Sequence, residues 1–120
     1  MDRFWPGRVT LVFEAAATVP NYLTAGSGKI GIRLPGHPVA AALIESLGAP
    51  LTGTSANLSG KPGCSCIDDL DPLLVQPMDA VLDAGPLKGG NGSTVVDVTG
   101  DIPRVLREGQ IPEKDILTLI

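Results

Sequence analysis

A single mixed α/β domain is the fold that this sequence predicts, and three observations support it. The chain has 120 residues, which is the size of one small domain. Segments rich in β-branched residues, such as VTLVFE at residues 9–14 and STVVDV at residues 93–98, are typical of strands. Apolar residues recur at helical spacing over residues 38–47, as in an amphipathic helix. The whole pattern predicts five or six strands and two or three helices.

Composition narrows the classes of function. Hydrophobic residues make up 43% of the chain, so a folded domain is expected rather than a disordered one. The net charge of −4 argues against a generally basic surface that coats nucleic acid. Because no apolar run is long enough for a signal peptide or a membrane span, we expect a cytoplasmic protein. Cys64 and Cys66 are too few for a structural zinc site and are expected to be reduced thiols.

The first half of the chain predicts two strands and one helix. Residues 9–14 form a nearly continuous apolar run, which is typical of a strand covered on both faces. Residues 15–28 indicate a loop with one helical turn, and residues 29–34 alternate between apolar and polar, as in a half-buried strand. A helix is expected to begin at Pro38, where a missing N–H costs nothing, and to end at Gly48.

The second half of the chain predicts further strands and a short helix. The expected strands lie at residues 50–54, 79–84, 93–98 and 103–107. An acidic helix is expected over residues 67–75, after a capping box at residues 65–68. Three aspartates at its start could hold a divalent cation, but helix capping explains them as well and is preferred. A final helical turn is expected over residues 113–119.

Polar side chains suited to an anion lie at four places beside the predicted strands. The stretch TGTSANLSG at residues 52–60 carries hydroxyls, an amide and glycines, although taken alone it is more typical of a turn. Arg33 and Arg107 each end a strand, and guanidinium groups donate paired hydrogen bonds to phosphate or carboxylate. Ser93 follows a glycine-rich loop at residues 85–92. These features predict a site for an anionic, nucleotide-like ligand.

The sequence shows no set of residues for nucleophilic or metal-dependent catalysis. It contains no evident Ser/His/Asp arrangement, no paired carboxylates, no metal-ligand cluster, and neither a Walker nor a G-x-G-x-x-G pattern. His37, the only histidine, is better explained as the start of a helix, because a catalytic base needs a partner and none is visible. Any catalysis is therefore expected to rest on positioning and electrostatics, as in phosphoryl and nucleotidyl transfer.

Five short motifs follow one another along almost the whole chain. They are WPGRVTLV at residues 5–12, IGIRLPGHP at 30–38, TSANLSG at 54–60, GSTVVD at 92–97 and LREG at 106–109. In the same order, the YrdC-like family carries W-P-G-P-x-T-L, V-x-V-R-x-P-x-H-P, T/P-S-A-N-x-S-G, E-S-T-V-V/I-D and L-R-x-G. The sequence therefore resembles the YrdC-like family of threonylcarbamoyl-AMP synthases, which implies a twisted mixed sheet flanked by helices.

The resemblance also implies a reaction and a set of ligands. The family makes threonylcarbamoyl-AMP from L-threonine, bicarbonate and ATP, with release of pyrophosphate and with Mg²⁺ as the expected counterion of ATP. A tRNA threonylcarbamoyl transferase then uses the product to modify the adenosine beside the anticodon of certain tRNAs. The implied contacts are threonine contacts at Arg33, Gly53 and Ser93, and ATP contacts at Ser55, Asn57 and Arg107.

Two family motifs have no counterpart in this chain. The P-T-x-T-x-Y-G-L and K-x-R motifs are missing, so residues 1–120 are expected to form one partial YrdC-like domain with exposed strand edges that favour self-association. A second hypothesis is a non-catalytic module that binds nucleotides or double-stranded RNA, with which the family is also associated. A third is the related carbamoyl-transfer domain of hydrogenase maturation factors, which the intact SAN triplet at residues 55–57 disfavours.

Overall fold

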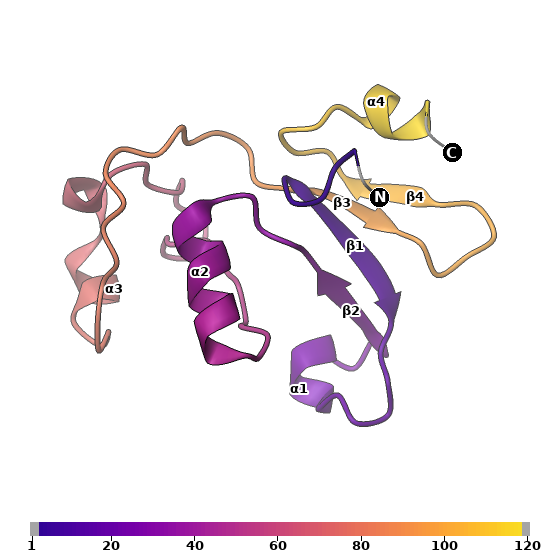
Figure 1. Cartoon of the computed structure of the whole chain (residues 1–120), viewed down its shortest axis with the longest axis horizontal. Coiled ribbons are helices and arrows are strands. Elements are labelled where there is room, and N and C mark those ends of the chain that lie inside the picture. Colours follow the sequence, from indigo (N-terminus) through magenta and orange to yellow (C-terminus); the bar gives the residue numbers. More distant parts are fainter. Residues whose placement is uncertain (1–2, 119–120) are drawn as a thin grey trace.

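A four-stranded mixed sheet forms the centre of the fold. The computed structural model describes residues 3–118. Strands β1 (Val9–Glu14) and β3 (Thr94–Asp97) lie side by side and parallel, and β2 (Lys29–Ile32) and β4 (Arg104–Arg107) pair antiparallel at the two edges, in the order β2-β1-β3-β4. Figure 1 shows this sheet together with the helices around it. The predicted mixed α/β class is confirmed, and β1 has its predicted bounds.

Short helices connect the strands. The described residues contain α1 (Asn21–Thr24), α2 (Pro38–Leu47), the 3₁₀ helix η1 (Ile67–Asp69), α3 (Pro72–Val75) and α4 (Glu113–Leu117). In Figure 1, α1 and α4 lie beside the sheet, whereas residues 37–84, which include α2 and α3, extend away from it. We call residues 37–84 the arm. The prediction of two or three helices was therefore too low, because single helical turns carry little periodicity. Residue 119, included in the predicted last turn, lies outside the described residues.

Helix α2 begins and ends where the sequence predicts. His37 precedes it in an extended conformation, and its carbonyl accepts a hydrogen bond from the Ala41 N–H at 3.0 Å. Pro38 occupies the first turn, where no intrahelical N–H is needed. Gly48 ends the helix in a left-handed conformation with φ 62°, which glycine adopts without steric cost. The predicted position of His37 at the start of the helix is thus confirmed. Its backbone carbonyl, and not its imidazole, makes the hydrogen bond there.

Two predicted strands are wrong. Residues 50–54 and 79–84 have strand-like composition but form no strand in the structure. A strand satisfies its backbone hydrogen bonds through an adjacent strand, and within residues 3–118 neither segment has such a neighbour. Their apolar side chains stay exposed, by 48% at Leu51 and 64% at Leu82. The described part of the chain accordingly contains four strands instead of the five or six predicted.

The predicted acidic helix over residues 67–75 is also wrong in its details. Asp71 is extended, with φ −63° and ψ 126°, because the residue before a proline is disfavoured in the helical region. Pro72 thus separates η1 from α3. The capping residue is Asp71, whose carboxylate accepts from the Leu73 N–H at 3.0 Å, and not Ser65 as predicted. Capping, which was preferred over cation binding for the acids, is confirmed at this one position.

The hydrophobic core is small and covers one face of the sheet. Val9, Val96 and Ile116 are its buried members, and partly buried residues such as Leu11 and Val105 pack around them. Side chains alternate between the two faces of a strand, so Val9 and Leu11 of β1 point to the same face. Val9 is the one buried residue of β1, and the others are partly or fully exposed. The prediction that β1 is covered on both faces was therefore wrong for this chain.

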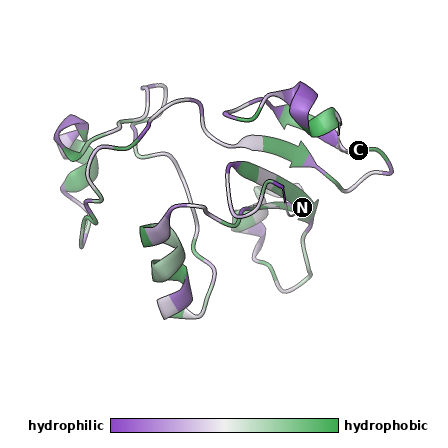
Figure 2. Cartoon of the chain, turned by 45° about the horizontal axis from the view of Figure 1, so that its top comes forward, coloured by the Kyte–Doolittle hydropathy of each residue, from purple (hydrophilic) through white to green (hydrophobic). Residues whose placement is uncertain are grey.

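Many apolar side chains remain exposed outside this core. Helix α2 has no buried residue, and Val39, Leu43 and Leu47 on its apolar face are 41%, 38% and 53% exposed. Figure 2 shows hydrophobic residues along this helix as well as along the strands. The radius of gyration is 15.5 Å, compared with about 14 Å for a compact domain of this length. None of the helices in residues 3–118 is long and apolar enough to cross a membrane.

We expect the isolated chain to self-associate as its concentration rises. The apolar face of α2 and the unpaired edges of β2 and β4 favour contact with other chains. Leu43→Glu should reduce the apparent mass measured by light scattering, because it places a charge in the middle of the apolar face. Glu45→Gln, a change at an exposed polar position of the same helix, is the control. A wild-type chain that stays monomeric at all concentrations would contradict this expectation.

Candidate functional site

The sheet topology gathers three predicted site residues at one end. The parallel register pairs Val9 with Thr94, so β1 and β3 both begin at this end. The antiparallel strands β2 and β4 finish there, since Ile32 pairs with Leu11 and Arg107 with Val95. Arg33 follows β2, Ser93 precedes β3 and Arg107 ends β4. Residues that are far apart in the sequence thus lie at the same end of the sheet, with Arg33 at the β2 edge and Arg107 at the β4 edge.

Ser93 is held by two neighbours at this end. Its Oγ lies 2.7 Å from the Oγ1 of Thr10, and its carbonyl accepts a hydrogen bond from Nη2 of Arg107 at 2.8 Å. A Cβ at Gly92 would lie 3.3 Å from the same Nη2, so a side chain there would crowd the guanidinium. Sequence reasoning did not select Thr10, although the residue lies within the WPGRVTLV motif. The position of its hydroxyl depends on strand pairing, which the motif alone does not reveal.

Thr94 ties the loop after β4 to this end of the sheet. It is fully buried, and its hydroxyl donates to the Ile111 carbonyl and accepts from the Gly109 N–H at 3.0 Å. Gly109 approaches so closely that a Cβ there would overlap backbone atoms of Gly92 and Ser93. Two residues of the LREG motif thus have distinct roles. Arg107 reaches toward Ser93, and Gly109 lies where a side chain would not fit.

Arg33 lies on a segment that is anchored at its backbone. The Gly7 N–H donates to the Leu34 carbonyl at 2.8 Å, and Pro35 is buried. The Arg33 side chain is exposed and makes no hydrogen bond or ion pair with any residue in the described part of the chain. Its guanidinium is therefore available to a carboxylate or phosphate.

The SAN triplet lies on the arm rather than on the sheet. Gly53 and Ser55 are exposed. The Asn57 Nδ2 donates to the carbonyls of Leu58 and Lys61 at 2.9 and 2.8 Å, so it stabilises its own turn. The side-chain amide of Asn57 thus has the turn-forming role that is the alternative to ligand binding for this stretch.

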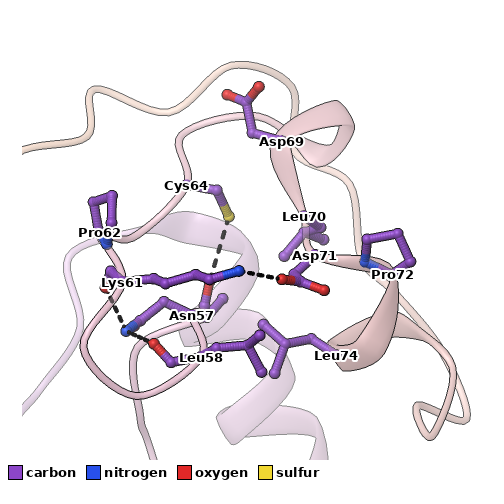
Figure 3. Close-up of a pocket in the computed structure, with 11 residues that line it drawn as sticks. Asn57, Leu58, Lys61, Pro62, Cys64, Asp69, Leu70, Asp71, Pro72 and Leu74 are labelled. Carbon is purple, nitrogen blue, oxygen red and sulfur yellow. Dashed lines mark hydrogen bonds and ion pairs between the residues drawn. The ribbon is translucent and has the colours of Figure 1, made fainter.

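A pocket of about 330 Å³ opens beside this turn. Figure 3 shows Asn57, the Lys61 ammonium and the Asp71 carboxylate within it, and Lys61 and Asp71 form an ion pair of 3.0 Å. The Leu73 N–H, followed by Lys61, lowers the pKa of Asp71. The pocket is lined by Ala56, Asn57, Leu58, Lys61, Pro62, Cys64, Asp69, Leu70, Asp71, Pro72 and Leu74. Of the six predicted ligand contacts, the pocket includes Asn57 alone.

The glycine-rich loop at residues 85–92 connects the arm with the sheet. On one side, the Leu87 N–H donates to the Ser65 carbonyl at 2.7 Å. On the other side, Gln110 Nε2 donates to the Gly89 carbonyl at 2.7 Å, and the Gln110 N–H donates to the Gly92 carbonyl at 2.9 Å. The loop therefore links the arm to the part of the sheet that carries Ser93 and Arg107. Within residues 3–118, the SAN triplet itself makes no hydrogen bond with Ser93 or Arg107.

The two cysteines on the arm are free thiols. The Cys66 Sγ donates to the Asp69 carboxylate at 2.8 Å, and this hydrogen bond raises the pKa of the thiol. Within residues 3–118, no group of three or more His, Cys, Asp or Glu side chains is arranged to hold a metal ion.

An ion pair lies at the other end of the sheet. The Lys29 Nζ is 3.0 Å from Oδ2 of Asp97 and donates to the Thr99 hydroxyl at 2.7 Å. Hydrogen bonds from the Thr99 hydroxyl and N–H, followed by the one from Lys29, lower the pKa of Asp97 to about 2. This group joins the start of β2 to the end of β3 and is separate from the cluster at Ser93.

We expect acid to weaken the fold through Asp97. Because its pKa falls on folding, the carboxylate stabilises the native state above about pH 4, and this contribution is lost as the pH falls toward 2. Asp97→Asn should therefore lower the melting temperature at pH 7 and reduce its further fall between pH 4 and pH 2. Thermal unfolding followed by circular dichroism checks this. Asp101→Asn, at an exposed position, is the control, and an equal acid response of wild type and Asp97→Asn would contradict the assignment.

Comparison with known proteins decides the family. The family model for Sua5, YciO and YrdC, described as telomere recombination, matches residues 1–109. The chain belongs to the Sua5/YciO/YrdC family. The threonylcarbamoyl-AMP synthases of Pyrococcus abyssi and Bacillus subtilis are 36% and 40% identical to it and align with 98% and 100% of its length. The predicted family is thus confirmed.

Solved structures of the Sua5/YciO/YrdC family share the fold. The structure of P. abyssi Sua5 complexed with L-threonine is 34% identical, with a TM-score of 0.87 over 99% of this chain. Escherichia coli YciO is 33% identical, with a TM-score of 0.67 over 91% of this chain. The chain spans about 35% of the length of the two synthases and of that P. abyssi structure, and 53% of YciO. The roles of the individual site residues stay predictions.

Proposed function

We propose that this chain provides one wall of the active site of a threonylcarbamoyl-AMP synthase. Such an enzyme joins L-threonine, bicarbonate and ATP into threonylcarbamoyl-AMP and releases pyrophosphate. The observation that carries the proposal is the placement of Arg33, Ser93 and Arg107 at the same end of the sheet. Each lies in a motif shared with the family, and relatives of that name align with nearly the whole chain.

In this proposal the amino-acid substrate binds between Arg33 and Ser93. The exposed guanidinium of Arg33 would pair with the threonine carboxylate, and the Ser93 hydroxyl would bond a polar group of the same ligand. Gly53 would lie along the same wall without a side chain to obstruct it.

The nucleotide would bind toward Arg107 and the SAN arm. Arg107 would contribute positive charge to the phosphates, with Ser55 and Asn57 as neutral hydrogen-bonding groups. Mg²⁺ would accompany ATP as the counterion of its phosphates. The product requires that a carbamate oxygen of threonine become bonded to the α-phosphorus of ATP as pyrophosphate leaves. No protein nucleophile is needed for this step, so positioning and charge stabilisation suffice.

The wider role follows from the product. A tRNA threonylcarbamoyl transferase would consume threonylcarbamoyl-AMP, so the proposal assigns this protein to tRNA modification, with the cytoplasm as its expected location. The alternative is a non-catalytic module that binds nucleotides or double-stranded RNA. A net charge of −4 argues against tight RNA binding, because phosphate contacts require Lys and Arg.

The decisive experiment measures turnover with the whole chain. The purified protein is incubated with ATP, L-threonine and labelled bicarbonate, with and without a separate polypeptide made of the part of the B. subtilis relative that this chain does not span. We expect threonine-dependent pyrophosphate release in the reconstituted mixture and its loss in Arg107→Ala. Nucleotide binding without release in either mixture would support the binding module, and neither binding nor release would overturn both hypotheses.

A further inference from the structure

The Thr10 hydroxyl has a single partner among the described residues. It lies 2.7 Å from the Ser93 hydroxyl, and neither group makes another hydrogen bond with residues 3–118. Because side chains alternate along β1, Thr10 points to the sheet face opposite the buried Val9. The pair is therefore located outside the hydrophobic core, at the end of the sheet where Arg33 and Arg107 also lie.

The two hydroxyls differ in conformational freedom. Thr10 is β-branched and in the middle of a paired sheet, so its χ1 angle is restricted. Ser93 precedes β3, and an unbranched serine can occupy several χ1 rotamers. The carbonyl of Ser93 is held by Arg107 at 2.8 Å, but this bond leaves its hydroxyl free to rotate. Thr10 is therefore the stiffer side chain of the pair.

Gly31 provides the room for this arrangement. It lies in β2 next to β1, and a Cβ built there would be 3.1 Å from Cγ2 of Thr10. The Thr10 methyl thus points toward β2 over a residue without a side chain, and its hydroxyl points toward Ser93. A glycine inside a strand often marks such a close approach. A methyl group at Gly31 would press on the Thr10 methyl, which would have to move by a few tenths of an ångström, and this would disturb the contact of its hydroxyl with Ser93.

We propose that Thr10 is a positioning residue that orients the Ser93 hydroxyl toward the amino-acid ligand, with Gly31 allowing the required rotamer. The inference rests on the proposed threonine site. A hydroxyl can donate one hydrogen bond and accept two. When Thr10 donates to Ser93, the Ser93 O–H remains available to donate to the ligand, so the pair acts as one preoriented donor.

The first test needs no ligand. Side-chain scalar couplings in NMR spectra of the complete chain report the χ1 angle of Ser93 in wild type, Thr10→Val and Thr10→Ser. We expect one dominant Ser93 rotamer in wild type and averaged couplings in Thr10→Val, which keeps the shape and removes the hydroxyl. Thr10→Ser keeps the hydroxyl but loses the branch that restricts χ1, so its couplings should lie between these two. Averaged couplings are also expected in Gly31→Ala. An unchanged Ser93 rotamer in Thr10→Val would overturn the proposal.

The second test measures L-threonine binding by calorimetry in the same variants, with melting temperatures recorded in parallel. Loss of one neutral hydrogen bond should weaken binding by about 2- to 10-fold in Thr10→Val. Thr10→Ser should restore part of the affinity, because it returns the hydroxyl, and a purely structural role would not make affinity follow the hydroxyl in this way. Equal affinities in wild type and Thr10→Val would overturn the proposal. If wild type binds no L-threonine, the proposed function fails, while the rotamer measurement still decides the role of Thr10.

Discussion

Gly109→Ala is expected to be the most destabilising single methyl addition in this chain. The new Cβ would overlap backbone atoms of Gly92 and Ser93, which cannot move as a flexible side chain can. Overpacking of this kind costs about 1–3 kcal/mol or more. Within residues 3–118 the core has three buried aliphatic members, so such a loss is a large part of the available stability. We expect the midpoint of urea unfolding, monitored by circular dichroism, to shift to a lower urea concentration, or the cooperative transition to be lost.

A matched control isolates the steric cause. Gly63→Ala adds the same methyl group at a position where nothing lies within 4 Å. It should leave the midpoint close to that of wild type. Similar midpoints for Gly63→Ala and Gly109→Ala would show that the close approach of Gly109 to Ser93 is not a feature of the folded protein.

Arg33→Ala is expected to produce the largest loss of ligand binding. Hydrogen bonds to charged groups contribute about 1.5–3 kcal/mol, so affinity for L-threonine should fall by about 10- to 150-fold. The fold should be unaffected, because the Arg33 side chain has no partner in the described residues. Arg33→Lys should recover part of the affinity, since it keeps the charge but loses the paired donors. Calorimetric titration with L-threonine measures these differences.

Arg104→Ala is the matched control for charge. Arg104 is also an exposed arginine, but it begins β4, where it lies opposite Asp97 of β3 in the strand register. It is therefore at the other end of the sheet from Arg33. Its removal should leave the threonine affinity unchanged. Equal losses in Arg33→Ala and Arg104→Ala would indicate that net charge, and not a site at Arg33, controls binding.

Local features of the fold were predictable from the sequence. The β-branched run of β1 and the proline and glycine at the two ends of α2 act through neighbouring residues, and both elements have their predicted bounds or nearly so. Residues 50–54 and 79–84 show the limit of such reasoning. Their composition favours strands, but a strand exists only when another strand pairs with it, and pairing is not encoded within five or six residues.

The candidate site divides in the same way. By itself, the sequence determined the family and the residue types suited to anions at Arg33, Ser93 and Arg107, because motifs and donor chemistry are read residue by residue. Only the tertiary structure decided that these residues lie at one end of the sheet, that Thr10 contacts Ser93, and that the Asn57 amide stabilises its own turn. The physical reason is that the parallel pairing of β1 with β3 joins segments separated by most of the chain. That pairing sets which strand ends lie together.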